Sequence, residues 1–348
     1  MHPAAGGAER TIQEVGPRLV GMGHKVRLIA SGWRGATSTD RIGGMEITRY
    51  PGNVPTHLAQ MTALAARRST YTVIDDLAHV VPWGSELLSN ASGTAFFRHL
   101  HARTLPGQVG KPLQVILGVV ERSYPALYEE YPFVVESASS RADLVRMGIG
   151  PGRVTMIPPG VDSNVFHPGQ RTSIPQLIYF AGLKPYKQPE LAVELLHRLQ
   201  MSGIQANLVI TGTGPSLSLV RERVRMRGLT DRVSFLGRVD IGQLSSVVRQ
   251  SWVNLHFAVA EGWSYSITEA AASAVPTVAF AAPGVVDSVV AGVTGLLAPP
   301  GDVDSFVRAL TRVLLDNESF GKRAFDHARQ RSWDDCARDW STHLESLG

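Results

Sequence analysis

Residues 256–280 read HFAVAEGWSYSITEAAASAVPTVAF, and this stretch decides the fold. An apolar strand runs into a loop that holds Glu261, a helix of small residues holds Glu269, and a second apolar strand follows. A strand, a helix and a second strand in this order are typical of a parallel α/β sheet. Surface charge and helix capping would explain the two glutamates without a ligand. A ligand with several hydroxyl groups would explain both together, because carboxylates accept hydrogen bonds from paired hydroxyls.

The same alternation of apolar strands and amphipathic helices extends through the chain. We expect strands at residues 25–31, 71–76, 93–101 and 132–139 in the first half, and at 176–182, 206–212, 232–237, 253–259 and 275–280 in the second. A stretch rich in proline, glycine and polar residues, 157–175, separates the two α/β runs. We therefore predict an N-terminal domain over residues 1–160, a C-terminal domain over 161–330, and a final helix over 331–348 that could return to the first domain.

Composition narrows the class of protein. The 348 residues are 44% hydrophobic and 18% charged, which is typical of a soluble globular protein with a large core. The single cysteine, Cys336, excludes an internal disulfide, and no apolar run approaches the ~20 residues of a spanning helix. The sequence favours a cytoplasmic protein. A net charge of +4 is too small to indicate nucleic-acid binding, but it is compatible with peripheral contact at the inner face of a membrane.

The front of the chain suggests a phosphate site. Gly6 and Gly7 precede a helix with Ile12, Val15 and Leu19 on one face. Amide groups at a helix start, reached through glycines that lack side chains, suit a phosphate, although an ordinary tight turn would also use two glycines. A loop of this kind normally follows a buried strand. No such strand precedes Gly6 in this sequence, so the N-terminal domain lacks the first strand that the pattern requires. We therefore expect that the start of the sequence omits or displaces that strand.

The ends of three expected strands in the second half carry further candidate residues. Lys184 and Lys187 follow the strand that ends at Gly182, and lysines at such an end suit a diphosphate, Lys187 more than Lys184. The strand at 206–212 stops at Gly212 in a Thr-Gly-Thr-Gly turn, where backbone could approach a flat ring or a phosphate. A plain strand-to-helix turn is the alternative. The segment FLGRV ends a comparable strand with Arg238 and Val239.

The helix that contains Glu269 begins near Tyr265 or Ser266. Its first amides, from Ser264 to Ser266, would lie at the positive end of the helix dipole and suit a phosphate or a sugar oxygen. The chain has no Asp-x-Asp run that would recruit a metal ion, so we expect no metal site.

These segments together resemble the family 4 retaining glycosyltransferases of the GT-B fold. The resemblance rests on Glu-x7-Glu within EGWSYSITEA, on GGAER at the front, on VTMIPPGVDSNVFHP at 154–168 and on VVAGVTGLLAPPGD at 289–302. It extends from Gly6 to about Trp340. It implies two facing Rossmann-like parallel-sheet domains with a cleft between them.

The resemblance also implies a reaction and a set of roles. Members transfer a sugar from a nucleotide donor to a hydroxyl group with retention at the anomeric carbon, commonly without a metal ion. The donor is a nucleotide-diphosphate sugar used as a substrate, and no cofactor is expected. By likeness, Glu269 would bind the donor ribose, Glu261 would lie by the transferred sugar, and Lys187 would bind the diphosphate. Gly6 and Gly7 would contact the phosphates of the donor. The turn of Gly262, Trp263, Ser264, Tyr265 and Ser266 would contact its sugar and phosphates. Gly212, Arg238 and Val239 would border its base.

Members of the family often carry a histidine near the transferred sugar, and His99 and His101 are both candidates here. The alternative is that these histidines only form hydrogen bonds with nearby backbone groups. Arg98, Arg103 and the pair Asp75–Asp76, with His79 behind them, lie at neighbouring strand ends and could face the acceptor. Two departures from the family pattern stand out. Gly182 occupies the place of a usual arginine, for which Lys184 could substitute, and Ser264 replaces a usual glycine.

The sequence leaves the acceptor open among lipid-linked molecules, polysaccharides and small molecules, and it leaves two rival functions. One is a nucleotide-sugar-binding protein without turnover, and the other is a nucleotide-sugar epimerase on the same two-domain fold. A nicotinamide-dependent dehydrogenase is excluded, because the front loop lacks the G-x-G-x-x-G spacing.

Overall fold

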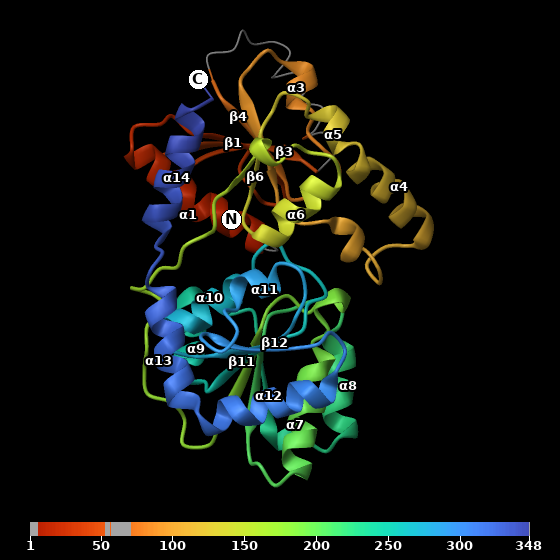
Figure 1. Cartoon of the computed structure of the whole chain (residues 1–348), viewed down its shortest axis with the longest axis vertical. Helices are drawn as coiled ribbons and strands as arrows, with labels where there is room; N and C mark the ends of the chain where they lie inside the picture. Colours follow the sequence, from red (N-terminus) through yellow and green to blue (C-terminus); the bar gives the residue numbers. More distant parts are fainter. Residues whose placement is uncertain (1–5, 53–55, 57–70, 348) are drawn as a thin grey trace. The chain divides into compact units, whose positions relative to one another are not determined.

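The computed structural model describes residues 6–52, 56 and 71–347, and it divides into two compact units (Figure 1). Unit 1 comprises Met1–Ala102, Pro112–Gly160 and Trp333–Gly348, and unit 2 comprises Arg103–Lys111 and Val161–Ser332. The chain therefore joins unit 2 briefly at Arg103–Lys111, leaves unit 1 again at Gly160 to build most of unit 2 in one stretch, and returns to unit 1 at Trp333.

Unit 2 is built on a six-stranded parallel sheet in the order β10-β9-β8-β11-β12-β13. Its strands are β8 (Gln176–Phe180), β9 (Asn207–Thr211), β10 (Val233–Gly237), β11 (Val253–His256), β12 (Thr277–Phe280) and β13 (Gly295–Ala298). Its helices are α7 (Glu190–Met201), α8 (Leu217–Met226), α9 (Ile241–Gln250), α10 (Tyr265–Ala272), α11 (Val285–Ser288), α12 (Val303–Leu315) and α13 (Asn317–Ala328).

Helices cover both faces of this sheet. Successive residues of β8 point to opposite faces, and each set packs against a different group of helices. Leu177 and Tyr179 pack with residues of α7, α8 and α12, including Phe306. Ile178 and Phe180 pack with residues of α9, α10 and α13. The near-continuous apolar sequence of the strand is thus explained by burial on both faces.

In the described part of unit 1, strands form two sheets. One has the order β1-β3-β2, with β1 (Arg27–Gly32) parallel and β2 (Thr39–Ile42) antiparallel to β3 (Met45–Pro51). The other is parallel with the order β4-β5-β6-β7, from β4 (Val73–Leu77), β5 (Gly93–Phe97), β6 (Phe133–Val135) and β7 (Val154–Met156). The described helices of unit 1 are α1 (Gly7–Gly21), α3 (Ser85–Leu88), α4 (Lys111–Arg122), α5 (Tyr124–Leu127), α6 (Ala138–Arg146) and α14 (Trp333–Glu345).

The C-terminal helix α14 packs against α1 within unit 1 (Figure 1). Trp340 is 2% exposed, and its ring meets Phe96 edge-on with the centroids 4.9 Å apart. At the surface, Arg18 Nε donates to Asp334 Oδ1 at 2.6 Å. Trp333 is also 2% exposed, so both tryptophans serve the core, as their seven-residue spacing predicts.

The predicted α/β class with parallel sheets is confirmed, while several element boundaries are different. The strand expected over 93–101 ends at Phe97, and the one expected over 132–139 ends at Val135. The sequence pattern did not predict β3, with seven residues, or the shorter strands β2, β7 and β13. Among the described residues, no helix is long and apolar enough to cross a membrane.

Candidate active site

The carboxyl ends of the parallel strands of unit 2 lie at one edge of its sheet, and an ion pair forms there. Lys187 ends the short 3₁₀ turn η3 (Pro185–Lys187) that follows β8, and Glu261 follows β11. Because β8 and β11 are paired, these loops meet, and Lys187 Nζ lies 2.8 Å from Glu261 Oε1. The Lys187 side chain is 18% exposed and that of Glu261 is 11% exposed. The pair is largely shielded from solvent, yet each side chain keeps some accessible surface.

The charge of Lys187 is stabilised by its partner. Burial, the largest single effect, lowers the pKa of the Lys187 ammonium, but the Glu261 carboxylate acts together with Tyr186 and Tyr179 to raise that pKa well above its ordinary value. The Lys187 Nζ also lies 5.6 Å from the centroid of the Tyr186 ring. The Tyr186 carbonyl accepts from the Val259 amide at 3.0 Å, which ties η3 to the loop after β11.

A third titratable group, His256, lies beside the pair. It is 2% exposed, and its Nε2 lies 3.6 Å from Glu261 Oε1. Burial, and then the Lys187 charge, lower the pKa of His256 to about 3. The imidazole is therefore neutral at ordinary pH, and the cation that faces Glu261 is Lys187.

The backbone at Glu261 is fixed by a close approach from the loop before α11. The Glu261 amide donates to the Pro283 carbonyl at 3.0 Å. Gly284 follows with φ of 76°, and a Cβ placed on it would lie 1.9 Å from the Glu261 carbonyl oxygen. Only glycine fits this position, because both the φ value and the contact exclude a side chain.

Helix α10 begins at Tyr265, as the sequence predicts, with Ser264 as its N-cap residue. The Ser264 amide donates to Ser288 Oγ at 3.0 Å, so this one of the three expected phosphate donors is already engaged. The Ser264 hydroxyl lies 3.1 Å from Ser266 Oγ. Glu269 lies half-buried in the second turn of the helix. Gly262 is buried, and Trp263 Nε1 donates to Thr268 Oγ1 at 2.9 Å.

The neighbouring strand ends are joined to one another by backbone contacts. The Gly212 amide donates to the Gly237 carbonyl at 2.7 Å. Gly212 has φ of 105°, and a Cβ on it would lie 2.2 Å from the Ala181 carbonyl oxygen. Arg238 is exposed and Val239 is half-buried just beyond β10. Lys184 is exposed, in contrast to Lys187.

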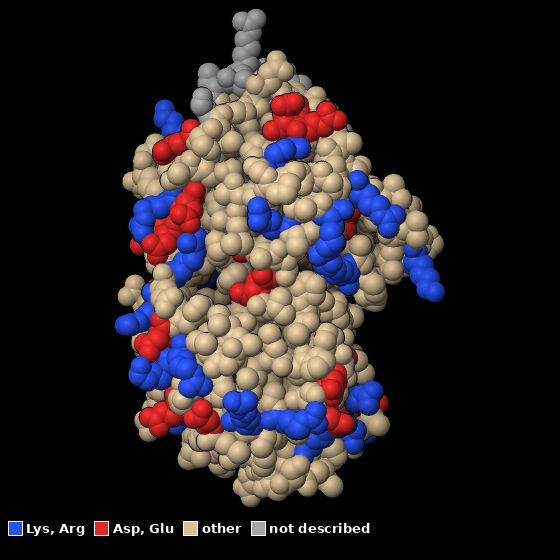
Figure 2. Space-filling view, in the orientation of Figure 1, with Lys and Arg blue, Asp and Glu red and all other residues tan. Residues whose placement is uncertain are grey.

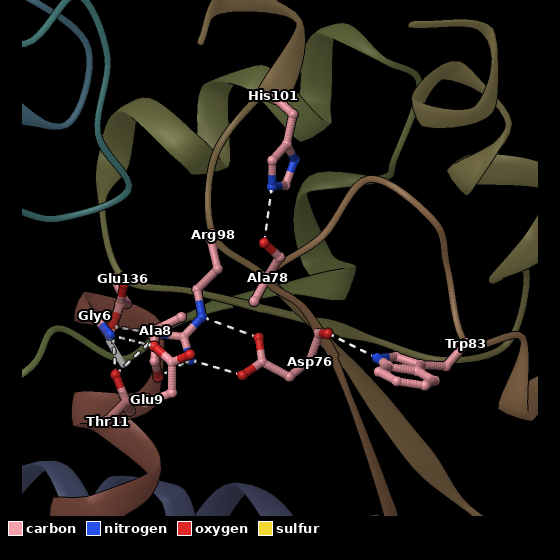
Figure 3. A network of polar contacts seen from close by, with 10 residues as sticks. All are labelled: Gly6, Ala8, Glu9, Thr11, Asp76, Ala78, Trp83, Arg98, His101 and Glu136. Atoms are coloured by element: carbon pink, nitrogen blue, oxygen red, sulfur yellow. Dashed lines mark hydrogen bonds and ion pairs between the residues drawn. The ribbon is translucent and has the colours of Figure 1, made fainter. Parts of the chain in front are cut away.

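In unit 1, the predicted phosphate loop lies at the start of α1. Gly6 and Gly7 are both exposed, and the Gly6 amide donates to Glu9 Oε2 at 2.8 Å (Figure 3). The helix start therefore already faces a carboxylate from its own first turn. A phosphate at this place would replace that contact.

Arg98 is the centre of a buried polar network in unit 1 (Figure 3). Its side chain is 5% exposed, and all five of its N–H groups have acceptors within the chain. The contacts are Nε to Asp76 Oδ1 at 3.1 Å, Nη2 to Asp76 Oδ2 at 2.9 Å and to the Ala8 carbonyl at 3.0 Å, and Nη1 to Thr11 Oγ1 at 2.9 Å and to Glu136 Oε1 at 3.0 Å. The network joins the ends of β4, β5 and β6 to the first turn of α1, so Arg98 positions the glycine loop.

This network corrects the expectation that Arg98 and the Asp75–Asp76 pair face an acceptor. Asp76 binds Arg98, whereas Asp75 is fully buried and accepts from the Ser85 amide at 3.1 Å and from the Tyr128 hydroxyl at 3.0 Å. Burial raises the pKa of the Asp75 carboxyl. Adjacent residues of a strand point to opposite sides, which explains their different partners.

The two candidate histidines have different surroundings. His101 is 8% exposed; its Nδ1 lies 3.2 Å from Glu121 Oε1 and its Nε2 lies 3.2 Å from the Ala78 carbonyl oxygen. Both ring nitrogens of His101 thus have acceptors of the protein itself. His99 is half-buried, and its ring lies 4.7 Å from that of His101.

The structure therefore joins Lys187 with Glu261 and places Gly212, Arg238, Val239 and residues 262–269 on the same unit. Gly6, Gly7, His99 and His101 belong to unit 1. The sequence pattern did not single out His256, whose signal was a histidine at the end of a strand shortly before Glu261. Across residues 6–52, 56 and 71–347, no three His, Cys, Asp or Glu side chains gather as a potential metal site.

Comparison with known proteins agrees with this architecture. The sequence model described as "Glycosyltransferase Family 4" matches residues 5–165, and the model described as "Glycosyl transferases group 1" matches residues 163–330. The two matches follow one another along nearly the whole chain. The chain belongs to the family 4 glycosyltransferases, and its fold is GT-B.

Individual relatives are similar over most of this chain. A GDP-mannose-dependent alpha-(1-6)-phosphatidylinositol monomannoside mannosyltransferase of Mycobacterium tuberculosis is 26% identical over 99% of this chain and 94% of its own length. A D-inositol 3-phosphate glycosyltransferase of Mycobacteroides abscessus is 28% identical over 73% of this chain and 59% of its own length.

Solved structures share the fold. Sucrose-phosphate synthase from Thermosynechococcus elongatus superposes with a TM-score of 0.82 at 21% identity, covering 99% of this chain and 94% of its own. Anabaena HepE in complex with UDP-glucose superposes with a TM-score of 0.77 at 16% identity, covering 99% of this chain and 97% of its own.

Proposed function

We propose that this chain transfers a sugar from a nucleoside-diphosphate sugar to a hydroxyl group of an acceptor, with retention at the anomeric carbon. The observation that carries the proposal is the Lys187–Glu261 ion pair beside the start of α10. It offers a cation, a carboxylate and a positive helix end at one edge of a sheet. These are the groups that a sugar diphosphate requires.

The proposed roles follow from how charge develops in the reaction. Breaking the bond between the anomeric carbon and the diphosphate builds positive charge on the sugar and negative charge on the leaving group. Lys187, with the amides at the start of α10, would stabilise the leaving diphosphate. Glu261 would lie by the transferred sugar, and Glu269 would accept hydrogen bonds from the ribose hydroxyls.

The remaining site residues complete the proposal. The turns at Gly212 and at Arg238–Val239 would border the base, and Gly6 with Gly7 would lie against the phosphates. We assign His99 to the acceptor or sugar and His101 to positioning, because the ring nitrogens of His101 already face Glu121 and the Ala78 carbonyl. Retention itself rests on membership of the family.

The choice of donors to test comes from the relatives. The Mycobacterium tuberculosis relative is named for GDP-mannose and for a phosphatidylinositol monomannoside, and Anabaena HepE was solved with UDP-glucose. We therefore place GDP-mannose and a lipid-linked, inositol-containing acceptor first, with UDP-glucose and sugar or small-molecule acceptors next.

A donor panel tests the proposal. Purified protein is incubated with GDP-mannose and with UDP-glucose, with and without phosphatidylinositol mannoside, and release of nucleoside diphosphate is measured. We expect acceptor-dependent release with one donor, no release with Glu261→Ala, and full release with the control Glu222→Ala, whose side chain is exposed on α8. The anomeric configuration of the product, read by NMR, tests retention.

The same panel separates the rival functions. A binding protein without turnover would retain the donor and release no diphosphate with any acceptor tested. An epimerase would change the sugar while it stays attached to the nucleotide. Either result with wild-type protein would overturn the proposed transfer.

A further inference from the structure

Helix α4 exposes an apolar face that the core of unit 1 does not use. Pro112, Val115, Ile116 and Val119 follow one another at the spacing i, i+3, i+4, i+7, so they share one side of the helix, here named the α4 face. Val115 is 68% exposed, and Ile116 and Val119 are each 59% exposed. Four neighbouring apolar side chains on a projecting helix form a patch and differ from the scattered exposed residues of an ordinary surface.

The opposite side of α4 carries Glu121, which anchors the helix to the turn at His101. Glu121 is 2% exposed, and its Oε1 accepts from the His101 amide at 2.6 Å while its Oε2 accepts from the Ala102 amide at 3.1 Å. In Figure 1 the helix projects outward from the sheet β4–β7. The anchor fixes which side of the helix faces inward, so the α4 face points away from the core.

The charges that helix α4 itself exposes are of one sign. Its one acidic residue, Glu121, is turned inward, and the exposed pair Glu129–Glu130 lies beyond the next helix, α5. Lys111 and Arg122 are exposed at the two ends of the helix. Figure 2 shows a mostly uncharged surface over α4, with Lys and Arg around it.

We infer that the α4 face is an interfacial membrane-binding surface that takes the headgroup region of an anionic lipid bilayer. Apolar side chains on one side, with Lys and Arg at the edge, are the composition of helices that lie in the plane of a bilayer surface. The aliphatic side chains would enter the acyl boundary, while Lys111 and Arg122 would reach the lipid phosphates. A second copy of this chain fits less well, because a symmetric contact would bring the basic residues of two α4 helices together.

The inference concerns binding and does not depend on the proposed transfer reaction. It also links the bilayer to a candidate site residue, because the carboxylate that holds α4 accepts from the backbone of His101. A helix docked on a bilayer in this way would bring the turn at His101 close to the lipid surface.

Vesicle co-sedimentation of the full chain tests the inference. We expect binding to vesicles of 30% phosphatidylglycerol in phosphatidylcholine, and binding at least about fivefold weaker to phosphatidylcholine alone, because each Lys or Arg near an anionic surface contributes about that factor. The variant Val115→Ser/Ile116→Ser/Val119→Ser should lose about tenfold or more in affinity, since it removes most of the apolar area. Lys111→Ala/Arg122→Ala should lose affinity for the anionic vesicles and little for the neutral ones.

Matched controls exclude general effects of exposed apolar groups. Met201→Ser and Leu315→Ser change side chains that are 75% and 85% exposed in unit 2, and both should bind vesicles like wild type. Circular dichroism should show wild-type helicity for every variant. As a second readout, Val119→Cys labelled with an environment-sensitive fluorophore should shift to the blue on anionic vesicles; the natural Cys336 is buried.

The inference is overturned if the triple serine variant binds vesicles like wild type, or if the label at position 119 stays in water while the protein sediments. It is also overturned if wild type is a dimer in solution that the triple variant converts to a monomer without any loss of vesicle binding. Failure of the proposed reaction would look different. Vesicle binding would then be intact and no nucleoside diphosphate would be released.

Discussion

Lys187 and Glu261 illustrate how a partly buried ion pair depends on both partners. With one partner removed, the other charge stays shielded from water without a counter-charge. Glu261→Gln and Lys187→Met should each lower the free energy of unfolding of unit 2, by about 2–3 kcal/mol after allowance for their residual exposure. The double variant should cost less than the sum of the two, because it leaves no unpaired charge. Urea unfolding followed by circular dichroism measures all four proteins, and strictly additive losses would contradict the coupling.

His256 predicts a pH dependence of stability. Its pKa is about 3 in the folded protein, whereas an unfolded chain restores the ordinary value of about 6.5. Between these values the unfolded chain binds a proton that the folded chain does not, so the free energy of unfolding falls as the pH falls. This loss of unfolding free energy is nearly absent well above about pH 6.5. Well below that pH, the unfolding free energy falls by about 1.4 kcal/mol for each pH unit.

Replacing the imidazole removes this dependence. Between about pH 7 and pH 5, wild type should lose about 2 kcal/mol more of its unfolding free energy than His256→Asn does. Urea midpoints at a series of pH values measure the difference. His343, whose pKa burial also lowers, is present in both proteins and cancels. Parallel curves for the two proteins would show that His256 titrates normally.

Glu269 carries the prediction most specific to the proposed donor. If it accepts hydrogen bonds from the ribose hydroxyls, it does so in both the ground state and the transition state. Glu269→Ala should therefore raise the KM for the donor about 10–100-fold and change kcat much less. Steady-state kinetics with the donor found in the panel separate the two constants. An equal loss in both, or no change in either, would argue against the ribose role.

At the scale of elements, the loop before α11 fixes the backbone of Glu261. Gly284→Ala would place a methyl group 1.9 Å from the Glu261 carbonyl oxygen, so one of the two loops must move. We expect a loss of stability of about 2 kcal/mol or more together with at least tenfold lower activity. Gly292→Ala is the matched control, because Gly292 also has a positive φ, of 80°, but no atom lies within 4 Å of the added Cβ. It should lose about 1 kcal/mol and keep its activity; equal effects of the two changes would refute the contact.

The sequence predicts elements better than contacts, for physical reasons. After a polar first residue, strands such as β8 and β12 are apolar because helices cover both faces of the sheet, and such runs are visible in a sequence. Short strands such as β7 and β13, with three and four residues, carry too little pattern to be seen in a sequence, and they form by pairing with β6 and β12.

The candidate site was predictable in part for the same reason. Lys187 and Glu261 could each be placed at a strand end, but their ion pair depends on β8 and β11 being neighbours, which local pattern does not encode. Arg98 could likewise be placed after a strand. That it binds Asp76, Glu136 and α1 rather than a substrate depends on three separate loops meeting.

At the scale of the whole molecule, the last helix belongs with the first. Trp340 is 2% exposed against Phe96 of β5, so Trp340→Ala should destabilise unit 1 by about 3–5 kcal/mol. Hydrogen exchange should rise in α1 and β5 and stay unchanged in β9. Leu310→Ala, in the core of unit 2, should give the opposite pattern. Equal changes in both units with either variant would mean that they unfold as one.

The path of the chain has a consequence for engineering. Helices α1 and α14 both lie in unit 1, so the segment Val161–Ser332 is inserted, in the sequence, between two parts of the same unit. It contains both members of the lysine–glutamate pair and all six strands that position them. A chimaera that received this segment from a relative would take all six strands from one protein, because both junctions lie outside the grafted sheet.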